Sequence, residues 1–403
     1  EHMPDEELMR ELESERGKGR DDYPVRGVWN SILAGVVFQH PSIESLRREL
    51  GRNAQLRYVC GLQDVPPSWV YSRFLGKLFR REEMVDEIFN RLVKELSEAL
   101  PGFGSHLAID GKAISSHARP KKEKKERDGR RDVDADFGKK VYRGEREDGT
   151  AWEKVISWFG YKLHLVVDAD YELPVAYEVT RASVSDVARA PVLLEGLKER
   201  QPEIIKRCEV FLGDKAYDDT KLITRLWDEY GIKPVIDIRN MWRDGEETRL
   251  FKGHDSVVYD FRGRVYCYCP VTLKPREMAY GGFEENRQCL KYRCPAKQYG
   301  IQCKGQEVCH VRGGLRVPLK EERRIFTPIA RSSYRWGRLY KKRTAVERVN
   351  SRLDVSFGFE HHFIRGLAKM KVRCGLALCV MLAMALGRVK EKQRDRIRSL
   401  VAA

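Results

Sequence analysis

The sequence lacks an apolar segment long enough to cross a membrane. Its longest apolar run, Gly375 to Gly387, has about 13 residues, whereas a membrane-spanning helix needs about 20. Basic residues flank this run, so it is better interpreted as a buried helix, and no membrane partner is expected. Glu1 to Met3 resemble a cloning remnant, and we recognise no signal peptide after them.

Acidic residues are too few to balance the basic ones. The 403-residue chain has 76 Lys and Arg against 60 Asp and Glu, which gives a formal net charge of +16. This excess favours a polyanionic partner, because each cation set against a phosphate releases a condensed counterion. Apolar residues make up 42% of the chain, which is enough for a sizeable core, and the length favours two or three domains.

The cysteines lack the paired Cys-x2-Cys spacing of a standard zinc ribbon, but they are clustered. Thiolates are good ligands for tetrahedral Zn²⁺, and a bound ion would order a segment that has little apolar content. We therefore predict a structural zinc site, with free thiols as the alternative. Six of the ten cysteines are the candidates, namely Cys267, Cys269, Cys289, Cys294, Cys303 and Cys309.

A second segment lacks any apolar anchor. Residues 116–131 contain eight basic and three acidic residues, a composition typical of a loop. A contact with a DNA backbone is one interpretation, and a merely solvated loop is the other. The basic residues expected to make that contact include Lys121, Lys122, Lys124 and Lys125.

The regular patterns divide the rest of the chain. Apolar residues recur at helical spacing over residues 23–100, and this basic helical block suits a DNA-reading module. Over residues 101–240, strand-like runs come first, followed by helix, strand, helix and strand, which predicts a mixed α/β sheet. Periodicity is weak between residues 239 and 331, and a helical pattern returns from Tyr334 onward.

Two aspartates each end a short apolar run. Asp110 closes SHLAID and Asp214 closes CEVFLGD, so each is predicted to end a buried strand. A carboxylate there is costly to bury unless it is paired or binds a cation. One such residue alone is more often part of a turn, but small and basic neighbours leave room here for a metal ion and a phosphate.

A third carboxylate lies in YKKRTAVERVNSRLD. On a helix, Tyr340, Arg343 and Glu347 share one face. An arginine on that face grips phosphate in a bidentate manner, while a surface ion pair between Arg343 and Glu347 is the alternative. Three converging carboxylates favour Mg²⁺ or Mn²⁺. Two such ions about 3.5–4 Å apart support phosphodiester hydrolysis and transesterification.

These blocks together resemble those of the bacterial insertion-sequence transposases of the DDE class. The resemblance rests on HLAIDGK around Asp110, FLGDKAYDD around Asp214, and Tyr340-x2-Arg343-x3-Glu347. It extends to GYKLHLVVDADYELPVAYEVTRASVSD and to YPVRGVWNSILAGVVFQHPSIESLRREL. It implies a ribonuclease H-like α/β core behind an all-α N-terminal domain. It also implies cleavage at the inverted repeats of a mobile element, attack of the 3′ ends on target DNA, and a homodimer on the DNA.

The sequence departs from that family's signature at one position. A lysine is expected seven residues after the glutamate, and this chain has Asp354 there. Arg348 and Arg352 lie nearby and are the candidate phosphate contacts. His164, Tyr217 and Asp218 are more often structural in such a context.

The resemblance assigns a role to each segment. We predict a charged arm (1–22), a helical DNA-binding domain (23–100), the first part of the catalytic core (101–240), a cysteine-rich insertion (241–331) and a helical C-terminal part of the core (332–403). A cytoplasmic, nucleoid-associated protein is expected. The alternatives are a ribonuclease H-like nuclease without strand transfer and a non-catalytic, domesticated DNA-binding protein.

Overall fold

The computed structural model describes residues 2–16, 22–118, 132–146 and 148–399. Contacts divide the chain into two compact units. Unit 1 consists of Glu1–Gly104, Asp110–Ile204 and Ala345–Ala403, and unit 2 of Ser105–Ile109 and Ile205–Thr344. Each unit is described by itself.

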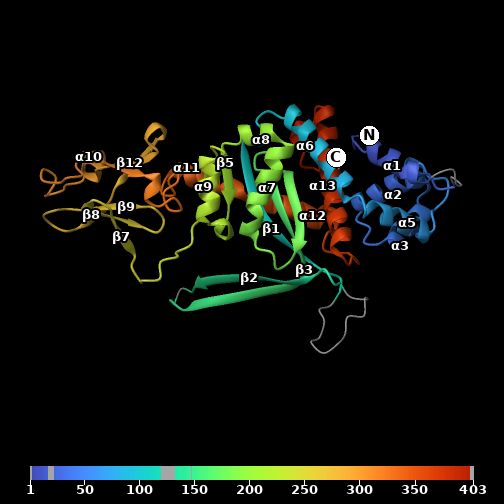
Figure 1. Ribbon diagram of the computed structural model, residues 1–403, viewed down its shortest axis with the longest axis horizontal. Helices are drawn as coiled ribbons and strands as arrows, with labels where there is room; N and C mark the ends of the chain where they lie inside the picture. Colours follow the sequence, from blue (N-terminus) through green and yellow to red (C-terminus); the bar gives the residue numbers. More distant parts are fainter. Residues whose placement is uncertain (1, 17–21, 119–131, 147, 400–403) are drawn as a thin grey trace. The chain divides into compact units, whose positions relative to one another are not determined.

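Unit 1 begins with six helices, which confirms the helical pattern expected before residue 100. They are α1 (Glu6–Arg16), α2 (Val25–Val37), α3 (Ile43–Arg52), α4 (Ala54–Val59), α5 (Ser68–Leu78) and α6 (Glu82–Ala99) (Figure 1). Ser42 and Asn53 cap α3 and α4 by accepting backbone N–H bonds with their side chains. The charged helix α1 is not merely solvated, because Asp5, just ahead of it, accepts a hydrogen bond from the buried Trp29 Nε1 at 2.5 Å.

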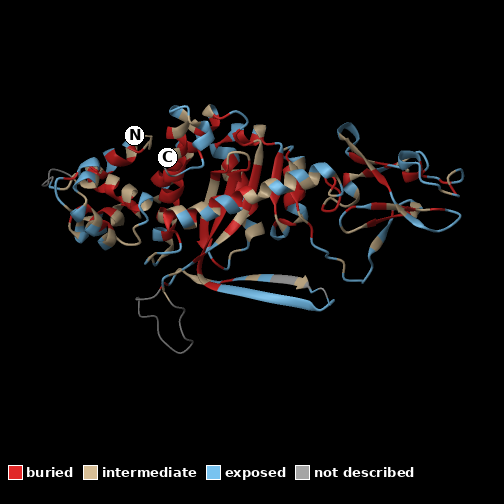
Figure 2. Cartoon of the chain, turned by 180° about the vertical axis from the view of Figure 1, so that it is seen from behind, coloured by how far each residue is buried: buried red, intermediate tan, exposed pale blue. Residues whose placement is uncertain are grey.

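Three antiparallel strands of unit 1 follow. They are β2 (Asp136–Glu145), β3 (Ala151–Asp168) and β4 (Leu173–Arg181), and α7 (Asp186–Arg200) comes next. The first half of β3 pairs with β2 and its second half with β4. Figure 2 shows β3 buried in its second half and exposed along the hairpin with β2. The sequence predicted β3, β4 and α7 but not β2.

The main sheet is mixed, as expected for the ribonuclease H-like core. Its strand order is β2-β3-β1-β5-β6, with β4 paired to β3. In unit 2 the first residues of β1 (His106–Ser115) pair in parallel with β5 (Val210–Gly213), which pairs in parallel with β6 (Lys233–Ile236). In the chain, α8 (Pro202–Arg207) precedes β5, and α9 (Thr220–Asp228) lies between β5 and β6.

The cysteine-rich segment of unit 2 has more regular structure than its weak periodicity predicted. One sheet contains β7 (Thr248–Phe251), β8 (His254–Asp260), β9 (Val265–Tyr268) and β10 (Pro275–Glu277). A second contains β11 (Ala279–Glu284), β12 (Cys289–Arg293) and β13 (Leu315–Pro318), and α10 spans Pro295–Tyr299. Val257, Val265 and Val317 are fully buried in a core that also includes Cys267 and Cys309.

The C-terminal part is helical, as predicted. It consists of α11 (Tyr334–Tyr340), a 3₁₀ turn (Lys341–Arg343), α12 (Thr344–Phe357) and α13 (Leu367–Lys390). Among the described residues, α13 alone is long and apolar enough to cross a membrane by length and composition. It is longer than the apolar run suggested, but 67% of its apolar window is buried. This burial is typical of the core helix of a folded domain.

Candidate active site

Asp110 and Asp214 each lie just beyond the residues through which β1 and β5 pair. The β1–β5 pairing ends at Ala108↔Leu212, and each aspartate lies two residues further along the chain. Asp214 follows the last residue of β5, as predicted, and its Oδ1 accepts the backbone N–H of Ala216 at 2.8 Å. The prediction that Asp110 ends its strand is wrong. β1 continues to Ser115, because its second half belongs to the part of the sheet formed with β3.

A third carboxylate stands at the end of the next parallel strand and was missed by the sequence reasoning. Asp237 directly follows β6, whose Ile236 pairs with Gly213 of β5. Its backbone N–H donates to the Gly213 carbonyl at 3.2 Å, and its Oδ2 lies 3.7 Å from Lys215 Nζ. The apolar run IKPVI ending on an aspartate was the available signal, since it repeats the pattern at Asp214.

Tyr340 and Arg343 lie close together in unit 2, but not on one continuous α-helix. The 3₁₀ turn between α11 and α12 places residues three apart almost in line, and the Arg343 guanidinium lies 5.6 Å from the centre of the Tyr340 ring. The ring of Trp336 stacks on the ring of Tyr340, with 4.7 Å between the two ring centres. Burial raises the pKa of Tyr340, and the charges of Asp237 and Asp214 raise it further. The phenol is therefore near both aspartates and stays protonated.

Glu347 lies in the first turn of α12, in unit 1, with its side chain exposed. Asp354, two turns later, forms an ion pair with Lys112 of β1, with Asp354 Oδ2 2.5 Å from Lys112 Nζ. This contact was not anticipated, because the sequence places the two residues 242 positions apart.

The two arginines predicted to contact phosphate have partners inside unit 1. Arg348 Nε donates to Glu172 Oε1 at 2.8 Å, and Arg352 donates to the backbone carbonyl of Glu172. Burial lowers the pKa of Arg352 to about 10. These contacts hold α12 against the turn between β3 and β4. A DNA contact by either arginine stays a prediction, and Lys121, Lys122, Lys124 and Lys125 lie outside the described residues.

The other residues considered in the sequence have structural surroundings. His164 is fully buried, with Nε2 2.9 Å from Thr180 Oγ1 and Nδ1 3.3 Å from Asp186 Oδ1. Asp218 is also buried, and its Oδ2 accepts from Arg324 Nη1 and from the backbone N–H of Arg239, each at 2.8 Å. Asp218 thereby joins the two ends of the inserted segment in unit 2.

The donor chemistry fits a hard divalent cation. Asp110 and Asp214 are half-buried carboxylates, and oxygen donors of this kind suit Mg²⁺ and Mn²⁺. In the described parts of the chain, no three His, Cys, Asp or Glu side chains form a group that could hold a metal ion. The structure therefore gives the positions of the carboxylates on their own elements and no assembled metal centre.

No three of the six candidate thiols, all of them described residues, form a group that could hold a metal ion, although pairwise electrostatic interactions and a hydrogen bond link five of them. Burial and the charges of Cys294, Cys309 and Cys303 raise the pKa of Cys267 to about 11. Burial raises the pKa of Cys303, and a hydrogen bond with Cys269 raises it further. Hydrogen bonds from the side chain and backbone of Thr272 lower the pKa of Cys269 to about 6. The sixth thiol stands apart on β12, where Cys289 Sγ donates to the Arg287 carbonyl at 3.0 Å.

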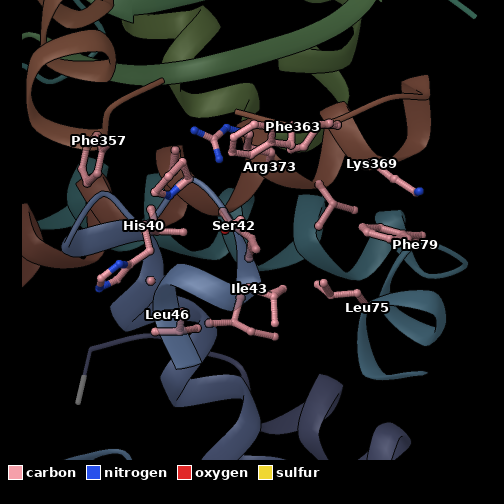
Figure 3. Close-up of a pocket in the computed structure, with 18 of the residues that line it drawn as sticks. His40, Ser42, Ile43, Leu46, Leu75, Phe79, Phe357, Phe363, Lys369 and Arg373 are labelled. Carbon is pink, nitrogen blue, oxygen red and sulfur yellow. The ribbon is translucent and has the colours of Figure 1, made fainter. Parts of the chain in front are cut away.

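A cavity of about 770 Å³ lies elsewhere in unit 1, among α2, α3, α5 and α13. Figure 3 shows its lining, with His40 and Ile43 on one side and Phe363 and Arg373 on the other. Neither Asp110 nor Glu347 belongs to this lining. The candidate carboxylates are thus not part of this cavity.

Comparison with known proteins identifies the family. No curated protein matches the sequence. Among solved structures, the chain is similar to one described as the cryo-EM structure of the piggyBac transposase synaptic complex with hairpin DNA, with 12% identity, 96% of this chain and 77% of that chain covered, and a TM-score of 0.35. The family model described as the transposase DDE domain matches residues 101–383. That range holds most of the chain, including Asp110, Asp214 and Glu347, and the protein therefore belongs to the transposase DDE domain family.

Proposed function

We propose that this protein is a DNA transposase that binds the ends of a mobile element, cleaves them, and joins the 3′ ends to target DNA by transesterification. The observation that carries the proposal is the placement of Asp110 and Asp214 in the chain, since each lies two residues beyond the last pair of the β1–β5 register, Ala108↔Leu212. Carboxylates at such positions are costly without a cation. Membership of the transposase DDE domain family supports the same site.

Each side chain has a proposed role. Asp110, Asp214 and Glu347 would hold Mg²⁺ or Mn²⁺, which when bound stabilises the attacking and leaving oxygens of an in-line displacement. Arg343 would bind the scissile phosphate in bidentate geometry. Tyr340, whose pKa is raised by burial and by two nearby aspartates, would donate a hydrogen bond to a phosphate oxygen. Double-stranded DNA and a second copy of the chain are the proposed partners, and the cytoplasm is the proposed location.

The test uses a plasmid that carries the candidate element ends. With Mg²⁺, the wild-type chain is expected to cut at the ends and to give joined products. Asp110→Asn, Asp214→Asn and Glu347→Gln are each expected to reduce cutting by at least about 100-fold while leaving DNA binding intact. Asp255→Asn, the same change at an exposed residue of β8, is the control. Wild-type cutting by any of the three variants would refute the assignment, and cutting without joined products would favour the simple nuclease.

We also propose that the thiols of unit 2 bind a structural Zn²⁺. The supporting contact is between Cys269 and Cys303, because a thiol whose pKa is lowered to about 6 is largely the thiolate that zinc prefers. Cys267, Cys294 and Cys309 are the candidates for the remaining ligands. Cys289 is not proposed as a ligand, since its thiol is hydrogen-bonded on β12.

A further inference from the structure

The two faces of β1 around Asp110 have different environments. Successive side chains of a strand point to opposite faces, so Asp110 and Lys112 share a face that Gly111 does not. A Cβ added at Gly111 would lie 2.2 Å from Asp186 Oδ1 and 3.3 Å from Lys162 Cδ. The Gly111 face is therefore covered by Lys162 and Asp186. The Asp110 and Lys112 face is the one that meets α12, since Lys112 Nζ contacts Asp354 there.

The matching face of α12 carries a polar stripe. Glu347, Asn350 and Asp354 are separated by three and four residues and so lie along one side of the helix. Buried oxygens on this stripe include Asn350 Oδ1 and Asp354 Oδ1, for which no hydrogen-bond partner is found among the described residues. A buried acceptor without a partner is costly. The stripe is therefore poorly explained as packing alone.

We propose that Lys112 is a positioning residue for the metal site. Its ion pair with Asp354 holds the polar stripe of α12 against the Asp110 face of β1, so that Glu347 is presented to the same ions as Asp110. Both contacting residues, Lys112 and Asp354, belong to unit 1. The inference rests on the proposed function of the carboxylates. The ion pair also accounts for the departure from the family signature. Position 354 lacks the expected lysine, and Lys112 of β1 supplies a positive charge beside it.

A second set of contacts fixes the opposite side of α12. Arg348 and Arg352 bind Glu172, so the helix is held at the turn after β3 as well as at β1. Loss of the Lys112–Asp354 pair is therefore expected to alter the rotation of α12 rather than to detach it. Partners that orient metal ligands in this indirect way typically affect metal affinity or activity by about 10–100-fold.

The experiment measures the Mg²⁺ dependence of end cleavage for Lys112→Met, which removes the charge and keeps the length of the side chain. The half-saturating Mg²⁺ concentration is expected to rise about 10-fold or more, with affinity for end-containing DNA within about twofold of wild type. Removal of a cation would by itself strengthen Mg²⁺ binding. Weaker Mg²⁺ binding by Lys112→Met would therefore mean that the metal ligands are no longer correctly placed. Lys112→Arg is expected to keep most of the wild-type affinity for Mg²⁺. The double variant that combines Lys112→Asp with Asp354→Lys is expected to keep most of it as well.

The control is Lys371→Met, which breaks the ion pair between Lys371 and Glu82 of unit 1, at 2.7 Å, far along the chain from the carboxylates. It is expected to leave the Mg²⁺ dependence unchanged. Unchanged or tighter Mg²⁺ binding by Lys112→Met overturns the proposal, and weaker DNA binding with normal Mg²⁺ dependence would make Lys112 a phosphate contact instead.

Two further measurements keep the outcomes separate. If Lys112→Met does not fold, as judged by circular dichroism, Lys112→Gln gives the same test, because it also removes the positive charge while keeping a polar side chain. If the wild-type chain does not cleave DNA, Mn²⁺ binding followed by electron paramagnetic resonance still compares wild type with Lys112→Met. Weaker Mn²⁺ binding by the variant then supports the positioning role although the proposed reaction has failed, and equal binding refutes it.

Discussion

Single side chains decide how α12 is held, and Glu172 is the clearest case. Its carboxylate is buried and accepts from Arg348 Nε at 2.8 Å, while Arg398 Nη1 lies 3.1 Å away. Its backbone adopts a positive φ of 58°, which is uncommon for a residue other than glycine. Nothing in DYELP distinguishes this glutamate from a solvated turn residue. The tertiary contacts alone reveal its role.

The prediction at this scale concerns stability. Glu172→Gln keeps the size of the side chain and removes the charge that balances Arg348 and Arg398. Both arginines are half-exposed, so the full cost of breaking a buried pair is not expected. We expect a loss of about 2 kcal/mol in the free energy of unfolding, measured by urea denaturation. Glu82→Gln, which breaks the partly exposed pair with Lys371, is expected to cost less than about 1 kcal/mol. Equal losses in the two variants would contradict the structural role of Glu172.

Elements differ in how well the sequence predicted them. The strand before Asp214 and the order of strands and helices over residues 101–240 were largely correct, because short apolar runs and a helical repeat are local signals. β2 was missed, since Gly138 and Gly144 interrupt its pattern and their places are filled by the rings of Trp158 and Trp152 across the hairpin. The extension of β1 beyond Asp110 depends on the position of β1 between β3 and β5 in the sheet. The residues HLAID alone do not predict it.

The inserted sheets were missed for a related reason. Their core is built from isolated apolar residues such as Val257 and Val317 together with thiols and tyrosines, so no long apolar run appears in the sequence. Asp110, Asp214 and Glu347 were proposed from their positions in short motifs. Asp237, Lys112 and the pairing of Asp354 were not, because strand register and long-range contacts determine them.

The prediction at the scale of elements concerns the thiols. Zn²⁺ is expected to copurify at about one ion per chain, measured by elemental analysis of the reduced protein. Cys269→Ser and Cys303→Ser are each expected to remove most of it. Cys289→Ser is the matched control, because its thiol is not in the interacting group, and it is expected to retain the metal. A zinc-free wild-type protein would contradict the site, and zinc loss in Cys289→Ser would contradict the proposed ligand set.

At the scale of the whole molecule, the net charge of +16 predicts salt-dependent DNA binding. Each phosphate contact adds about 0.9 to the slope of log affinity against log salt concentration. Replacement of Lys121, Lys122, Lys124 and Lys125 by Gln is expected to lower that slope by up to about 3.6 if all four contact duplex DNA. The slope is measured by fluorescence anisotropy over a range of KCl concentrations. An unchanged slope would mean that this segment is solvated and makes no backbone contact.

The ion pair between β1 and α12 has a consequence for recognising related chains. A motif written from α12 alone treats Asp354 as a missing lysine, although a cation lies 2.5 Å from it. The two positions should therefore change together in homologues. Chains with an acidic residue at the position of Asp354 are expected to have a basic one two residues after the first aspartate. Chains with a lysine at the position of Asp354 do not need a basic residue two residues after the first aspartate.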